Sequence, residues 1–133
     1  MFCAALLHAL DQPRCTLSVA FVGIRKMRLI NRRYLGRDYA TDVLSFSYQG
    51  AEMEGMPFLG EIVIAPAVAF RHAVRYRSAL ERELRRLLVH GTLHLLGYDH
   101  EADRGQMDRI QAKLLHRSFF LNAPPLAQSK AAR

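Results

Sequence analysis

The stretch HGTLHLLGYDH, residues 90–100, places three of the chain's six histidines close together. The first two, His90 and His94, are four residues apart, so on a helix their Cβ atoms lie about 5–6 Å from each other on one face. Gly97 can adopt the left-handed conformation that ends a helix, and the chain can then turn back and bring His100 to the same place. We therefore expect the three imidazoles to bind one divalent ion.

The chemistry of three neutral histidines favours zinc. Zinc binds imidazole nitrogen at about 2.0–2.1 Å, and a site with three protein ligands keeps the fourth tetrahedral position open for a reacting water. A structural site would be closed by a fourth protein ligand. The stretch therefore predicts one catalytic Zn²⁺ ion with His90, His94 and His100 as its ligands.

The segment before the histidines has the apolar periodicity of a helix over residues 79–96 that runs from solvent into the core. Strands are expected at 15–22, 43–48 and 59–66, with residues 49–57 as the turn region of a hairpin. Further helices are expected at 1–10, 24–34, 66–77 and 103–119. This order predicts an α+β fold, in which helices cover a single small mixed β-sheet and the three-histidine zinc site lies at the end of a buried helix. We expect one domain over residues 1–133, with a flexible tail at 126–133.

Composition narrows the class of protein. Half of the residues are apolar and 23% are charged, which is typical of a globular chain. No apolar run approaches the roughly 18 residues that a membrane span requires. The apolar N-terminus lacks the basic leader of a signal peptide, and two cysteines are too few for a disulfide scaffold. These features predict a cytoplasmic protein that does not enter a membrane.

The charge of the chain indicates its partner. A net charge of +7 and a pI near 10 favour a polyanion, with nucleic acid ahead of an acidic membrane surface. The basic residues form two clusters, which are Arg25, Lys26, Arg28, Arg32, Arg33 and Arg37, and then Arg71, Arg75, Arg77, Arg82, Arg85 and Arg86. We expect these clusters to bind RNA or DNA.

The spacing of the histidines is also that of the metzincin peptidases, whose motif is H-E-x-x-H-x-x-G-x-x-H. In those enzymes the glutamate after the first histidine is the general base that deprotonates the zinc-bound water. Here that position is Gly91. A metallopeptidase is therefore the weaker of two hydrolase hypotheses.

The same stretch resembles the H-G-x-L-H-L-x-G-Y-D-H signature of the YbeY family of endoribonucleases. INRRY (30–34), Asp38 and TDVLSF (41–46) are similar to a second segment of that family, and GEIVI (60–64) is similar to one of its strands. The resemblance implies a single-strand-specific, zinc-dependent endoribonuclease that acts on ribosomal RNA precursor at the small ribosomal subunit. It would mature the 3′ end of the small-subunit rRNA and serve ribosome quality control. By position, it also implies that His90, His94 and His100 are the zinc ligands.

One departure from the family pattern concerns substrate binding. The family carries an arginine directly after the tyrosine of the second segment, and this chain has Leu35 there. Arg33, Arg37 and Ser45 are the candidate substrate contacts, and no catalytic residue is assigned beyond the metal ligands. The candidates for accepting the free N–H groups of the ligands are Asp42, Glu61 and Asp99. A third hypothesis is an RNA-binding ribosome-assembly factor with a structural metal.

Overall fold

The computed structural model describes residues 2–99 and 101–116. Its elements in chain order are α1 (Phe2–Ala9), β1 (Thr16–Phe21), α2 (Ile24–Leu35), β2 (Val43–Met53), β3 (Met56–Ile64), α3 (Pro66–Arg75), α4 (Leu80–Leu95) and α5 (Gln106–His116). The predicted α+β architecture with one small mixed sheet is confirmed. The expected end of the last helix at 117–119 and the expected tail at 126–133 lie outside the described residues.

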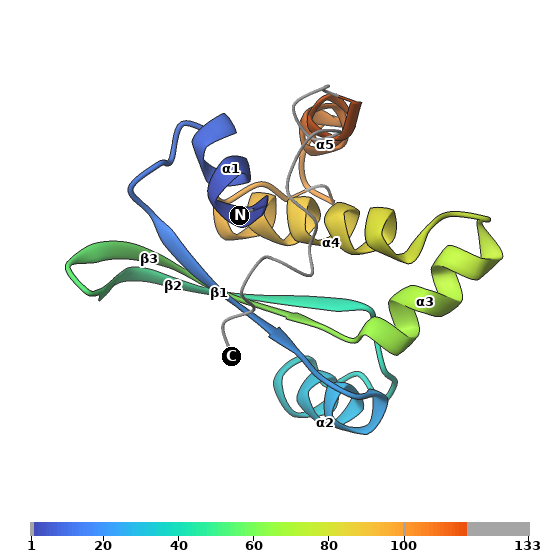
Figure 1. Ribbon diagram of the computed structural model, residues 1–133. Coiled ribbons are helices and arrows are strands. Elements are labelled where there is room, and N and C mark those ends of the chain that lie inside the picture. The colour runs from blue at the N-terminus through green and yellow to red at the C-terminus, as the bar shows by residue number, and fades with distance from the viewer. Residues whose placement is uncertain (1, 100, 117–133) are drawn as a thin grey trace.

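The sheet has the strand order β1-β3-β2, with β1 parallel and β2 antiparallel to β3. In Figure 1, α4 crosses one face of the sheet and α2 covers the other. Successive residues of the central strand serve both faces: Ile62 belongs to the core under α4, whereas Val63 packs with Met27 of α2. Because only the last part of β3 is buried on both faces, its apolar run is confined to Ile62–Ile64.

The hairpin between β2 and β3 is longer than the sequence predicts. The predicted turn region at 49–57 is wrong, since β2 continues to Met53 and β3 begins at Met56. The turn itself is Glu54–Gly55, whose φ angles of 52° and 78° fit a two-residue hairpin turn with both central residues left-handed. Gly50, with φ of 79°, accompanies a register shift between Ser47 and Ala51. The extended ladder was not predicted because polar residues and a bulge on these exposed strands interrupt the alternation of apolar and polar residues.

Helix α4 is the buried helix that the leucine pattern predicts, and its end has the predicted form. Gly97 has a φ of +99°, its N–H donates to the carbonyl of His94, and the N–H of Tyr98 donates to the carbonyl of Leu93. This pair of bonds is the Schellman arrangement, which satisfies two carbonyls at the helix end. Helices α1 and α5 contribute Phe2 and Met107 to the same core. No helix in the described part of the chain is long and apolar enough to cross a membrane.

Candidate metal centre and its cleft

The first two predicted ligands meet at one point. The Nε2 atoms of His90 and His94 lie 3.1 Å apart, and the ring centroids are separated by 4.6 Å. Two nitrogens held at about 2.0–2.1 Å by one tetrahedral zinc ion would be separated by about 3.3–3.4 Å. The donor pair therefore fits a zinc ion with little rearrangement. The third predicted ligand, His100, lies outside the described residues, three positions after the glycine that turns the chain.

Gln111 of α5 orients one of these rings. Its Oε1 lies 3.0 Å from Nδ1 of His90. An amide oxygen only accepts hydrogen bonds, so this contact favours the His90 tautomer with its proton on Nδ1 and the lone pair of Nε2 towards His94. That tautomer is the one a metal ligand requires at Nε2. The sequence analysis missed Gln111, although a polar residue between Met107 and Leu114 on the buried face of α5 was a usable signal.

The two histidines open into a cleft of about 580 Å³. It runs along β2 and is lined by Tyr34, Leu35, Arg37, Val43, Leu44, Ser45, Phe46, Ser47, His90, His94, Leu95, Asp99 and Glu101. Two of the predicted substrate contacts, Arg37 and Ser45, are therefore in the cleft. Arg33 instead lies over the ring of Tyr34, with its guanidinium carbon 5.8 Å from the ring centroid.

Gly91 lets α4, the helix that carries His90 and His94, lie close to the sheet. A Cβ atom at this position would lie 3.0 Å from a methyl carbon of Ile62 and 3.1 Å from Oγ of Ser45. The Ser45 hydroxyl donates to the Gly91 carbonyl at 3.3 Å, which ties β2 to α4 beside the histidines. A side chain at position 91 would therefore require Ile62 or Ser45 to shift. The metzincin glutamate is absent from this position, so the peptidase remains the weaker hypothesis.

The structure separates the three residues proposed to support the ligands. Asp99 lines the cleft, and its Oδ1 accepts the backbone N–H of Glu101 at 3.0 Å. Glu61 accepts the hydroxyl of Ser18 at 3.5 Å. Asp42 lies with His72, whose Nδ1 is 3.1 Å from Oδ2 of the carboxylate. None of these three contacts was predicted from the sequence.

Asp42, His72 and Glu83 form a second cluster of potential metal ligands, with one atom from each within 4.8 Å of the others. The guanidinium of Arg86 already serves this cluster: it contacts Glu83 at 2.6 and 3.1 Å and lies 3.9 Å from Asp42. These hydrogen bonds to Glu83 raise the pKa of Arg86 above its usual range. A divalent ion would have to displace this fixed charge, so the histidine cleft is the better metal site.

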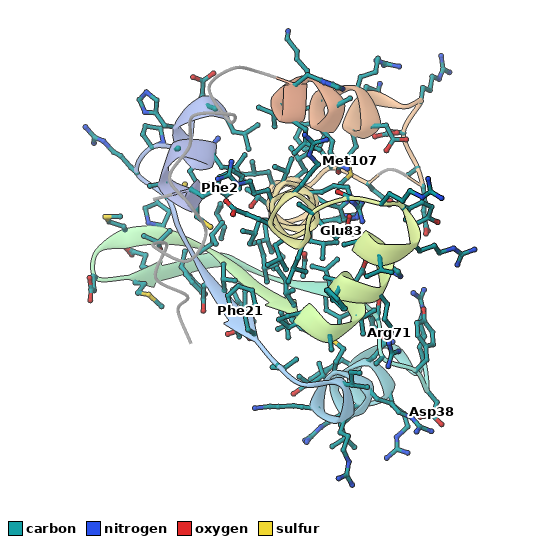
Figure 2. All side chains as sticks on the ribbon, turned by 45° about the vertical axis from the view of Figure 1, so that its right-hand side comes forward. Phe2, Phe21, Asp38, Arg71, Glu83 and Met107 are labelled. Atoms are coloured by element: carbon teal, nitrogen blue, oxygen red, sulfur yellow. The ribbon has the colours of Figure 1, made fainter. Side chains whose placement is uncertain are left out.

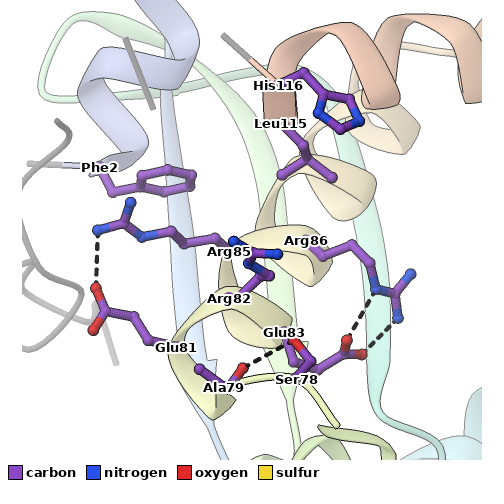
Figure 3. A pocket seen from close by; sticks show the side chains of 10 residues that line it. All are labelled: Phe2, Ser78, Ala79, Glu81, Arg82, Glu83, Arg85, Arg86, Leu115 and His116. Carbon is purple, nitrogen blue, oxygen red and sulfur yellow. Dashed lines mark hydrogen bonds and ion pairs between the residues drawn. The ribbon is translucent and has the colours of Figure 1, made fainter. Parts of the chain in front are cut away.

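A cavity of about 600 Å³ lies between α1, the first half of α4 and the end of α5 (Figure 3). Both of its carboxylates are paired with arginines, since Arg85 contacts Glu81 at 2.9 Å and Arg86 contacts Glu83. Its histidine is His116. In the part of the chain that is described, this cavity therefore lacks the paired imidazoles of the cleft.

Basic side chains project into solvent around α2 and α3. Figure 2 shows Asp38, which follows α2, and Arg71 of α3 at the same end of the molecule. The carboxylate of Asp38 receives two hydrogen bonds from Arg28, at 2.8 and 3.1 Å, and these bonds lower the pKa of Asp38. This exposed pair removes one arginine from the basic surface. Most members of the two clusters remain exposed to solvent.

Comparisons with known proteins agree with this geometry. The family model described as Endoribonuclease YbeY matches residues 2–118. A protein of that name from Thermodesulfovibrio yellowstonii is 45% identical over 102 residues, which cover 74% of this chain and 64% of the relative. The namesake from an Anaeromyxobacter species is 47% identical over 113 residues, 84% of this chain and 58% of the relative. The matches thus span about three fifths of the length of these two relatives.

A solved structure supports the fold. The chain aligns with the solution structure of a protein from Thermotoga maritima at a TM-score of 0.56 and 27% sequence identity. The alignment covers 84% of this chain and 80% of that one. The similarity therefore extends over most of both chains.

Proposed function

Because this chain belongs to the Endoribonuclease YbeY family, we propose that it is a metal-dependent endoribonuclease that cuts single-stranded RNA. We further propose that its substrate is ribosomal RNA precursor on the small ribosomal subunit. Its role would be the maturation of the 3′ end of the small-subunit rRNA and ribosome quality control, in the cytoplasm.

The observation that carries the proposal is the convergence of the His90 and His94 Nε2 atoms, 3.1 Å apart in an open cleft. These two residues and His100 would hold one Zn²⁺ ion, which supplies polarisation of a phosphoryl oxygen and activation of a water molecule. Gln111 holds His90 in the required tautomer. The imidazoles, not the Asp42 cluster, are assigned to the ion because Arg86 already lies beside those carboxylates.

The remaining groups of the cleft suit a phosphodiester better than a peptide. Arg37 offers a planar pair of donors to phosphate oxygens at the cleft wall. The chain as a whole carries a net charge of +7, which favours a polyanion. Gly91 stands where a metzincin has its glutamate base, so the chain supplies no carboxylate next to His90.

The test compares the purified chain with His94→Ala. Wild-type protein should contain one equivalent of zinc and cleave a single-stranded rRNA precursor fragment, and a chelator should abolish cleavage. His94→Ala should lose both properties, whereas His116→Ala, an exposed histidine on α5, should retain both. A full equivalent of zinc in His94→Ala would show that the ligand assignment is wrong. Binding of ribosomal subunits without any cleavage would instead favour the assembly factor.

A further inference from the structure

The cleft lies along an open edge of the sheet. Strand β2 is the last in the order β1-β3-β2, so it pairs with β3 on one side only in the described part of the chain. Its residues alternate between the two faces: Ser45 bonds to α4 beside the histidines, whereas Phe46 packs with the core under α2. A ligand in the cleft therefore meets the histidines on one face of the sheet and the end of α2 on the other.

The wall formed by the end of α2 is apolar and exposed. The rings of Tyr34 and Phe46 meet edge to face, with centroids 5.5 Å apart and planes at 69°. Tyr34 is nevertheless 61% exposed and the adjacent Leu35 is 49% exposed, and both line the cleft. Single exposed apolar residues are ordinary on a protein surface. Two adjacent ones, supported by a half-buried phenylalanine in the same cleft as a pair of convergent imidazoles, form a binding surface.

We propose that Tyr34 and Leu35, supported by Phe46, form a stacking site for one unpaired nucleobase of single-stranded RNA. This inference rests on the proposed function and specifies what the cleft recognises. An aromatic ring offers a flat π face on which any base can stack, and each such contact contributes substantially to single-strand binding. In a duplex both faces of each base are covered by its neighbours. The site would therefore select single strands without selecting a sequence.

The charges around the wall fit a base with its phosphates nearby. The guanidinium of Arg33 lies over the Tyr34 ring, 5.8 Å from its centroid, and Arg37 lines the same cleft. A nucleotide whose base lies on Tyr34 can place its phosphates towards these cations and towards the histidine side of β2. Stacking and charge neutralisation then reside on different residues. Removal of the ring should change affinity without changing its dependence on salt.

The experiment measures binding of a short fluorescent RNA single strand, and of the matching duplex, to the full chain in a chelator so that no cleavage intervenes. Tyr34→Ala should weaken single-strand binding by about 5- to 150-fold, with an unchanged salt slope and little change in duplex binding. Tyr34→Phe, which keeps the ring, should bind like wild type. Tyr48→Ala is the matched control, because Tyr48 is 49% exposed on the same strand as Phe46 and stacks on Phe58, away from the cleft lining.

The outcomes separate this inference from the proposed function. If wild-type protein binds RNA but Tyr34→Ala binds no worse than Tyr48→Ala, the stacking site is wrong and the endoribonuclease proposal is unaffected. Equal losses of single-strand and duplex binding in Tyr34→Ala would also overturn the stacking site, since they indicate general damage to the surface. If wild-type protein binds neither RNA, both proposals fail. Thermal unfolding of each variant shows whether a loss reflects the fold.

Discussion

Replacement of Gln111 by leucine should weaken zinc binding without removing a ligand. The amide oxygen of Gln111 accepts the Nδ1 proton of His90 at 3.0 Å, and leucine has similar volume but no acceptor. Without that acceptor the His90 ring can rotate or move its proton to Nε2, the atom that faces His94. Loss of such an outer partner typically lowers metal affinity by about 10- to 100-fold. This factor corresponds to about 1.4–2.7 kcal/mol of binding free energy.

The assay is competition for zinc between the protein and a chromophoric chelator at neutral pH. Gln111→Glu should bind zinc at least as tightly as wild type, because a carboxylate accepts the same proton more strongly. Gln106→Leu is the control on the same helix, since its amide oxygen accepts the backbone N–H of Arg104 at 2.7 Å. Nitrogen NMR of the metal-free protein should show the Nδ1–H tautomer at His90 in wild type and its partial loss in Gln111→Leu.

Equal zinc affinities for wild type and Gln111→Leu would refute the positioning role of Gln111. A loss in Gln106→Leu as large as that in Gln111→Leu would also refute it, because the effect would then arise from α5 as a whole. Gln111→Glu should bind zinc at least as tightly as wild type, and both should bind it more tightly than Gln111→Leu. Gln106→Leu should have the zinc affinity of wild type.

Five further predictions concern other residues of the chain. Leu35→Arg should raise single-turnover RNA cleavage with zinc content unchanged, by up to the roughly 10²–10³ that one such electrostatic contact supplies; no gain together with a large loss in Arg37→Ala would show that Arg37 has that role. Burial raises the pKa of the Cys3 thiol to about 11, so at pH 8 it should react with a disulfide reagent about 100-fold more slowly than in the unfolded chain. Because the folded state holds the Cys3 proton more tightly than the unfolded state, the contribution of this thiol to the free energy of unfolding should be complete below pH 9 and lost as the pH rises towards 11. Denaturant titrations at several pH values measure this loss. Gly97→Ala should lower the unfolding free energy by about 1 kcal/mol or more, because φ of +99° strains alanine although its Cβ would meet no atom; an unchanged denaturation midpoint would contradict this. Since Gly91 supplies no carboxylate beside His90, a casein-like substrate should not be turned over, and chelator-sensitive peptidase activity would overturn the ranking of peptidase below endoribonuclease.

The sequence was sufficient to predict α4 and the proximity of His90 and His94 because their determinants are local. A leucine stripe places one side of the helix in the core, and the four-residue spacing puts His90 and His94 on one side. Gly97 ends the helix through bonds to residues only three to five positions away. Such features depend on neighbouring residues and not on how distant elements pack, so a single sequence reveals them.

The partners of the site were not predictable in the same way. Gln111 meets His90 across 21 positions, and this contact depends on how α5 lies on α4. Asp42 contacts His72 and lies near Arg86 because α3 and α4 pack beside the start of β2. The motif TDVLSF does not determine this packing. The length of the β2–β3 hairpin was underestimated because the pair Glu54–Gly55 is a less common sequence for a left-handed two-residue turn than Asn-Gly. Each of these features is fixed by tertiary packing.

The end of α2 carries both the departure from the family pattern at Leu35 and the exposed wall of the cleft. Helix α2 ends at Leu35, and Gly36, with φ of 68°, turns the chain so that Arg37 returns to the cleft. The last helical turn thus presents a ring and a leucine where the family pattern would add a guanidinium, and the cation at the wall comes from beyond the helix. A base gains contact area from this arrangement, whereas a phosphate loses a charge partner. RNA binding by this chain should therefore depend less on salt than binding by its own Leu35→Arg variant, because one fewer counterion is released.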